Sequence, residues 1–264
     1  MALQAMLGLL SESIRHYESA EEIAAKVAVE PGLSPEERED LLRIPHDRLH
    51  AYQHDIYMAD RNMLEWGFAN TWRCLRQLQF GEAHNAPGDA ERGFVLRFKR
   101  NYPCATHSVR EMGALFVKYL ARDCTAICQQ YPWLLELAEA ELLEIEVLYA
   151  ADSPHGTAPG PPEREAFFAQ SLGDLLDQRI VRAEAVRVLA LAHDLAAVKR
   201  TLAGADAVEA LDFTAAPFLP SAAPMHFAIA RDHASLEPVW YRADAGDAAF
   251  VAALSEQRPQ TVES

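Results

Sequence analysis

The feature that most constrains the fold is a helical repeat of apolar residues from residue 48 onward. Its positions are separated by alternating steps of three and four residues: Leu49, Tyr52, Ile56, Ala59, Met63 and Trp66. An α-helix has 3.6 residues per turn, so this spacing places all of them on one face. The sequence therefore predicts a long amphipathic helix whose buried face is this stripe.

Further helices are expected on both sides of this one. Ser34-Pro35-Glu36-Glu37 is typical of a helix start, with Ser34 as the N-cap and Glu37 closing a capping box, and Ser108 and Glu111 repeat that spacing. A helix is predicted over about 90–100. A second begins after Ser108 and has Val109, Met112, Phe116 and Tyr119 on one face. A third begins at Pro132 and has Leu135, Ala138, Leu142, Ile145 and Tyr149 on one face. Short connections between them favour a bundle.

The last third of the chain differs in character. Residues 152–164, DSPHGTAPGPPER, hold four prolines and two glycines, which predicts a linker. A short helix over about 165–182 is expected to return to the bundle. Two segments rich in aromatic and β-branched residues, 225–230 and 238–242, are typical of strands, 186–193 fits a strand or a helix, and 247–257 reads as a closing helix. We therefore predict a mainly α fold: a helical bundle domain over 1–182 and a small mixed α/β domain over 183–264.

Charge and composition restrict the class of protein. The 264 residues include 24 Lys and Arg against 39 Asp and Glu, a net charge of −15. Because cationic patches supply most nucleic-acid affinity, this balance disfavours a DNA-binding protein. The most apolar segment, 132–151, carries five glutamates and is not expected to cross a membrane. Without a basic signal-peptide region, and with four scattered cysteines, a cytoplasmic location is expected.

Candidate metal ligands and nucleophiles are present but incomplete. His46, His50 and His54 line one helix face, yet they span roughly 12 Å, too far for one ion to hold all three. Cys124 and Cys128 have no second cysteine pair, and none of the ten histidines has a glutamate three residues before it, as di-iron bundles require. A metal site that uses His46, His50 and Cys104 or Cys128 remains an alternative. The absence of phosphate-loop, serine-hydrolase and zinc-protease motifs makes catalysis by this chain alone less expected, and we predict no catalytic residue, metal or cofactor in it.

Four segments together carry a resemblance to a known family. They are 41–57 (LLRIPHDRLHAYQHDIY), 64–71 (LEWGFANT), 98–120 (FKRNYPCATHSVREMGALFVKYL) and 132–141 (PWLLELAEAE). The chain resembles the HvfC/BufC family, which carries a DNA-binding label, and within it the MbnC branch of methanobactin biosynthesis. The likeness covers residues 41 to about 152 well and the remainder more loosely. Where the family often has Arg-x-Asn after its tyrosine, this chain has Gln53-His54-Asp55.

The resemblance implies a non-catalytic partner subunit. Such a subunit pairs with a TIM-barrel multinuclear iron oxygenase, which converts cysteines of a ribosomal precursor peptide into oxazolone–thioamide groups that bind copper. The partner subunit is implied to help bind the leader peptide and to support the oxygenase, with iron held by the oxygenase and no cofactor in this chain. The alternative function is the one in the family label, a DNA-binding transcription regulator.

The residues suggest where a peptide would bind. An extended peptide can add to an open sheet edge, so the expected peptide-binding residues lie on the two strands: Phe227, Ile229, Val239, Trp240 and Tyr241. Trp240 and Tyr241 point to opposite faces of their strand, so one packs the core while the other lines a groove. The alternatives are that both are core residues, and that the peptide instead binds the bundle surface around Arg48, Tyr52 and Asp55.

Overall fold

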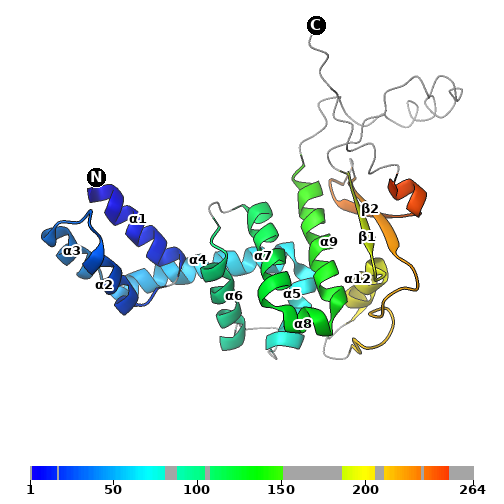
Figure 1. The fold of residues 1–264 in the computed structure, drawn as a ribbon, viewed down its shortest axis with the longest axis horizontal. Coiled ribbons are helices and arrows are strands. Elements are labelled where there is room, and N and C mark those ends of the chain that lie inside the picture. Colours follow the sequence, from blue (N-terminus) through cyan, green and yellow to red (C-terminus); the bar gives the residue numbers. More distant parts are fainter. Residues whose placement is uncertain are drawn as a thin grey trace, which may run out of the picture. The chain divides into compact units, whose positions relative to one another are not determined.

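In the computed structural model, the residues whose positions are described are 2–16, 18–80, 88–104, 108–150, 186–205, 211–232 and 235–249. The chain divides into two compact units, Met1–Gln130 and Tyr131–Ser264. The first consists of helices, and the second combines helices with a three-stranded antiparallel sheet (Figure 1). The predicted mainly α fold with a small α/β unit is confirmed.

The first unit contains α1 (Ala2–Arg15), α2 (Ala20–Val29), α3 (Pro35–Leu42), α4 (His46–Gly67), α5 (Ala69–Leu75), the π-helical segment η1 (Arg76–Phe80), α6 (Asp89–Asn101), α7 (Val109–Asp123) and α8 (Thr125–Gln130). The capping box of Ser34 and Glu37 is confirmed, because each residue's side chain accepts a hydrogen bond from the other's backbone N–H, at 3.2 and 2.7 Å. Ser19 and Glu22 form a second box at the start of α2 that was not predicted. Ser108 is the N-cap of α7, but its side chain makes no capping hydrogen bond, so the box predicted there is wrong.

Aromatic side chains from the junction of α4 and α5, from α6 and from α7 form one hydrophobic core of this unit. The rings of Phe68 and Phe116 meet edge to face at 4.9 Å between centroids, and those of Phe94 and Tyr119 at 5.2 Å. Edge-to-face pairs add stability beyond the area that they bury. Met112, Phe116 and Tyr119 are all buried, which confirms the predicted inner face of α7.

The buried face of α4 agrees with only part of the predicted stripe: Leu49 is buried and Ile56 and Met63 are half-buried, whereas Ala59 is exposed. Tyr52 is 63% exposed and Trp66 57% exposed, so the prediction is wrong for both. Besides Leu49, which belongs to the stripe, α4 buries Gln53, Tyr57, Asp60 and Leu64. Two of these are polar, and each has a buried partner: Gln53 binds backbone carbonyls and Asp60 pairs with Lys99. Polar residues with internal partners occupy positions that the apolar pattern assigned to solvent.

The second unit contains α9 (Pro132–Leu148), β1 (Val186–Leu191), α12 (Leu195–Gly204), β2 (Met225–Arg231) and β3 (Pro238–Ala243). The strand order is β1-β2-β3, and both pairings are antiparallel. Both predicted strands are confirmed, and the segment 186–193, which fitted a strand or a helix, supplies β1. Of the expected closing helix, residues 247–249 are helical, within a turn that starts at 245, and the remainder lies outside the described residues.

The division between the units falls earlier than the boundary expected after residue 182. α9 runs beside the sheet (Figure 1). Val147 of α9 and Ile229 of β2 are both fully buried and pack together, and Trp133 near the start of α9 lies 4.8 Å from Phe218 between ring centroids. This helix therefore supplies the core of the α/β unit. The predicted linker over 152–164 and the helix expected over about 165–182 lie outside the described residues.

Candidate peptide-binding sheet

β2 is the central strand of the sheet, which corrects part of the predicted site. Its backbone pairs with β1 on one side and with β3 on the other, so it has no open edge. Phe227 and Ile229 are buried, and Ile229 packs against Val147 of α9. Both are core residues, because alternate side chains of a strand share a face and this face is covered by a helix. Neither presents its side chain to a peptide.

The edges of the sheet are β1 and β3. Among the described residues, neither strand pairs with another on its outer side. An open edge carries a row of backbone donors and acceptors that a further extended segment can pair with. The predicted residues Val239, Trp240 and Tyr241 all lie on β3 and therefore on an edge strand.

Trp240 and Tyr241 lie on opposite faces of β3, as predicted. Trp240 is opposite Ile229 in the register and packs on the side of α9, with its ring 5.4 Å from that of Phe227. Tyr241 is opposite Ala228 and is 54% exposed. Val239 shares the outer face with Tyr241, because it is two residues away along the strand. The tyrosine, rather than the tryptophan, is available to a ligand.

Polar contacts from α9 fasten the sheet to the helix. Arg187 of β1 bonds Glu146 at 3.3 Å, and Arg231 of β2 donates to the carbonyls of Leu148 and Ala150 at 3.0 Å each. Beyond the end of β1, the Glu136 carboxylate accepts from the backbone N–H groups of Ala192 and His193 at 3.0 and 3.1 Å, and lies 3.0 Å from the His193 ring nitrogen Nδ1. These bonds hold β1 and the central strand β2 in fixed positions against α9, and β3 is paired to β2 along its length, so the sheet is already ordered before a further strand is added.

The second predicted surface lies on α4 in the first unit. Arg48, Tyr52 and Asp55 are all exposed and follow one another at steps of four and three, so they share a helix face. Trp66 is also exposed and adds an apolar side chain to the surface of the same helix. The sequence analysis offered this surface as the alternative peptide site, although its apolar stripe also placed Tyr52 on the buried face.

The cysteines of α8 and its N-terminal flank lie in an environment that keeps them protonated. Burial raises the pKa of the Cys124 thiol to about 11 and that of Cys128 to about 11. The Cys128 thiol lies 3.4 Å from the carbonyl oxygen of Leu120. Because the thiolate is the nucleophile and the metal ligand, this environment suppresses both roles at neutral pH.

The histidine face of α4 is exposed. The rings of His46 and His50 lie 6.5 Å apart between centroids. Within the part of the chain that the structure describes, no three or more His, Cys, Asp and Glu side chains are grouped so that they could hold a metal ion. The absence of a metal from this chain stays a prediction.

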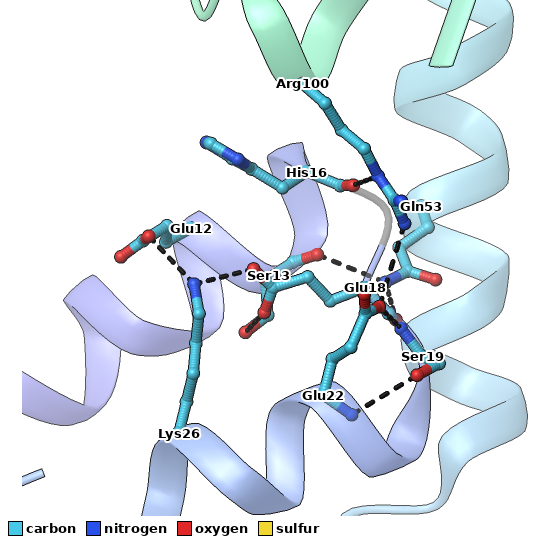
Figure 2. Close-up of polar contacts among 9 residues, drawn as sticks. All are labelled: Glu12, Ser13, His16, Glu18, Ser19, Glu22, Lys26, Gln53 and Arg100. Carbon is cyan, nitrogen blue, oxygen red and sulfur yellow. Dashed lines mark hydrogen bonds and ion pairs between the residues drawn. The ribbon is translucent and has the colours of Figure 1, made fainter. Parts of the chain in front are cut away.

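Sequence reasoning missed a polar cluster at the connection between α1 and α2 (Figure 2). Lys26 bridges Glu12 and Glu18 at 2.8 and 2.6 Å. From α4, Gln53 donates to the carbonyls of Ser13 and Glu18 at 3.2 and 2.9 Å. Figure 2 also shows Arg100 reaching from α6 to the carbonyl of His16, at 3.2 Å. The spacing of Ser19 and Glu22 was the one signal in the sequence that a helix restarts here.

No family model matches the sequence, and no curated protein is significantly similar to it. Among the described residues, no helix is both long enough and apolar enough to cross a membrane.

Proposed function

We propose that this chain is the non-catalytic subunit of a peptide-modifying complex, and that its sheet binds the leader of a ribosomal precursor peptide by strand addition at β3. The observation that carries the proposal is the exposed Tyr241 on an edge strand whose opposite face is fixed to α9. Main-chain hydrogen bonds along β3 supply affinity, and the outer-face side chains Val239 and Tyr241 supply selectivity.

The identity of the partner rests on the resemblance to the HvfC/BufC family. The proposed partner is a TIM-barrel multinuclear iron oxygenase that converts peptide cysteines into oxazolone–thioamide groups, as in methanobactin biosynthesis. In this arrangement iron belongs to the oxygenase, and this chain contributes peptide binding and positioning. The net charge of −15 disfavours the alternative, a DNA-binding regulator, because DNA repels an acidic surface.

Co-expression tests the partnership. The chain and an iron oxygenase encoded beside it are expected to elute as a 1:1 complex, with an interface of about 2,000 Å² or more, as is usual for obligate partners. Separate elution at micromolar concentration would contradict the subunit role. Binding of a DNA duplex with a steep dependence on salt would instead favour the regulator.

Peptide binding is measured separately, by fluorescence anisotropy with a labelled leader from a short cysteine-containing reading frame beside the gene. Tyr241→Ala is expected to weaken binding about tenfold or more, as aromatic anchors at interfaces do. Tyr52→Ala is the matched control, since Tyr52 is an exposed tyrosine on the other candidate surface. If Tyr52→Ala weakens binding and Tyr241→Ala does not, the peptide binds α4 and not the sheet.

The two edges of the sheet are distinguished by a second pair of variants. Val188 of β1 and Tyr241 of β3 are both opposite Ala228, so Val188 and Val239 lie on the same outer face at opposite edges. A lysine at an edge position is a common means of blocking strand addition. Val239→Lys is therefore expected to weaken peptide binding and Val188→Lys to leave it unchanged. The reverse result would move the peptide to β1.

A further inference from the structure

The first unit contains a cavity of about 470 Å³ that the proposed function does not use. Apolar side chains of α4, α6 and α7 form one part of its wall, among them Ile56, Phe98 and Met112. Charged side chains, Arg15, Asp60 and Lys99, form another part. This volume and this mixture are typical of small-molecule sites, which combine apolar walls with a few polar groups.

Two small residues of α1, Gly8 and Ser11, leave space on the side of the helix that lines the cavity. Gly8, Ser11, Glu12 and Arg15 all line it, and their spacing places them on one face of the helix. A Cβ atom added at Gly8 would meet no other atom within 4 Å. Larger residues at Gly8 and Ser11 would fill part of the space, so these two small residues help to keep the cavity open.

The carboxylates in the cavity wall already have ion-pair partners. The Asp60 carboxylate lies 2.6 Å from Lys99 Nζ, and the side chains of both residues are only 10% exposed. The Glu12 carboxylate lies 2.8 Å from Lys26. Each wall carboxylate thus has a cationic partner. A charged group of a ligand would therefore bind to the cationic side chains of the wall.

Two cations of the wall can bind such a group. The Lys99 ammonium has three N–H donors, and among the described residues Asp60 is its one partner. The Arg15 guanidinium has no hydrogen-bond or ion-pair partner within the same described part of the chain. A buried ammonium with unused donors is costly unless another acceptor reaches it. An anionic group in the cavity would provide that acceptor.

We propose that this cavity binds a small amphipathic molecule with an apolar body and a single anionic head, such as a carboxylate. The head lies between Arg15 and Lys99, and the body packs against Phe98, Tyr102 and Met112. A charge-assisted hydrogen bond to a carboxylate is stronger than a neutral one, which selects for an anionic head. The proposal does not depend on the peptide-binding role of the sheet.

Decanoate serves as the probe, and the full chain is titrated by calorimetry. One equivalent is expected to bind, and decylammonium, with the same body and the opposite charge, is expected to bind at least about tenfold more weakly, equivalent to about 1.4 kcal/mol. Equal or tighter binding of decylammonium would overturn the assignment of an anionic head. Failure of decanoate to bind at millimolar concentration would overturn the site.

Three variants test whether the probe binds in this cavity. Gly8→Leu is expected to abolish decanoate binding by filling the cavity, and Gly8→Ala is the matched control that keeps most of the space. Both replace glycine within a helix, so both are expected to fold and to keep or gain thermal stability. Arg15→Gln, on the exposed end of α1, is expected to weaken decanoate about fivefold and to leave decanol unchanged. Unaltered decanoate binding in both Gly8→Leu and Arg15→Gln would show that the probe binds elsewhere.

Discussion

The indole N–H of Trp240 in β3 donates a hydrogen bond to the Glu144 carboxylate in α9. The same carboxylate oxygen accepts a hydrogen bond from Lys199 of α12, whose ammonium also lies 5.0 Å from the centre of the Trp240 ring. One tryptophan therefore links an edge strand to two helices. Its role in the structure is to join the sheet to the helices, whereas the adjacent Tyr241 faces outward.

This difference predicts that two neighbouring substitutions lower the free energy of unfolding by very different amounts. Trp240→Ala is expected to lower the free energy of unfolding by about 2–3 kcal/mol, somewhat less than a fully buried aromatic, because Trp240 is only partly buried. Tyr241→Ala is expected to change it by less than about 0.5 kcal/mol, since exposed substitutions usually have small effects. Urea unfolding measures both. Equal losses would mean that Tyr241 also belongs to the core.

The sequence predicts those parts of the fold that depend on patterns within a single segment. Helical periodicity located α4, and alternation with β-branched residues located β2 and β3, because these patterns reflect each segment's own geometry. The face that α4 buries was missed because it depends on partners far along the chain. Gln53 is buried only because the α1–α2 connection offers carbonyls, and Asp60 only because Lys99 is beside it.

Gln53 is accordingly expected to matter more than any exposed apolar residue of α4. Gln53→Leu keeps the volume of the side chain but removes the donor to the carbonyls of Ser13 and Glu18, at a cost of about 2 kcal/mol. Tyr52→Ala, one position away and largely exposed, is the control and should cost about 0.5 kcal/mol or less. Chemical denaturation of both variants tests this ranking. A larger loss for Tyr52→Ala would mean that the predicted stripe is buried in solution.

The boundary between the units was beyond sequence reasoning for a related reason. The stretch from Pro132 reads as one more bundle helix, and a proline-rich linker follows it at 152–164. What assigns α9 to the sheet is packing between Val147 and Ile229, which are 82 positions apart. The candidate site shows the same limit. Sequence alternation placed Trp240 and Tyr241 on opposite faces, but only the strand order revealed that β2 has no open edge.

A buried ion network in the first unit gives a further prediction. The Glu91 carboxylate, which is buried, bonds Arg61 at 2.7 Å and Arg76 at 3.1 Å. Glu91→Gln removes the buried anion of this network and leaves Arg61 and Arg76 with Glu65, at 2.8 and 2.9 Å, as their shared anion. Because the Glu65 side chain is 38% exposed, it replaces the buried carboxylate only in part, and the expected cost is about 2 kcal/mol. Glu39→Gln breaks the exposed pair with Arg43 and is expected to cost less than about 1 kcal/mol. Thermal unfolding compares the two, and similar shifts in Tm would contradict a buried role for Glu91.

The two thiols near α8 give a prediction about alkaline pH. Burial raises the pKa of Cys124 and of Cys128 to about 11 each, from an ordinary value of 9.0. Above pH 9 the unfolded chain releases these protons while the folded chain keeps them. The unfolded state then binds fewer protons than the folded state, so the free energy of unfolding falls as pH rises. The contribution of the thiols is constant below about pH 9 and is lost between about pH 9 and 11.

Urea unfolding under reducing conditions at pH 7.5, 9.0 and 10.0 measures this loss. The parent chain is expected to lose stability between pH 9.0 and 10.0 more steeply than the double variant Cys124→Ser, Cys128→Ala. Burial raises the pKa of Tyr119 from 10.0 to about 12, so the loss of stability from this tyrosine begins only at about pH 10, the upper end of the range measured. The double variant has lower stability at pH 7.5, because a buried sulfur is removed, but its profile is flatter above pH 9. Parallel profiles would mean that the two thiols titrate in the folded chain as they do in the unfolded chain, and that they are open to solvent.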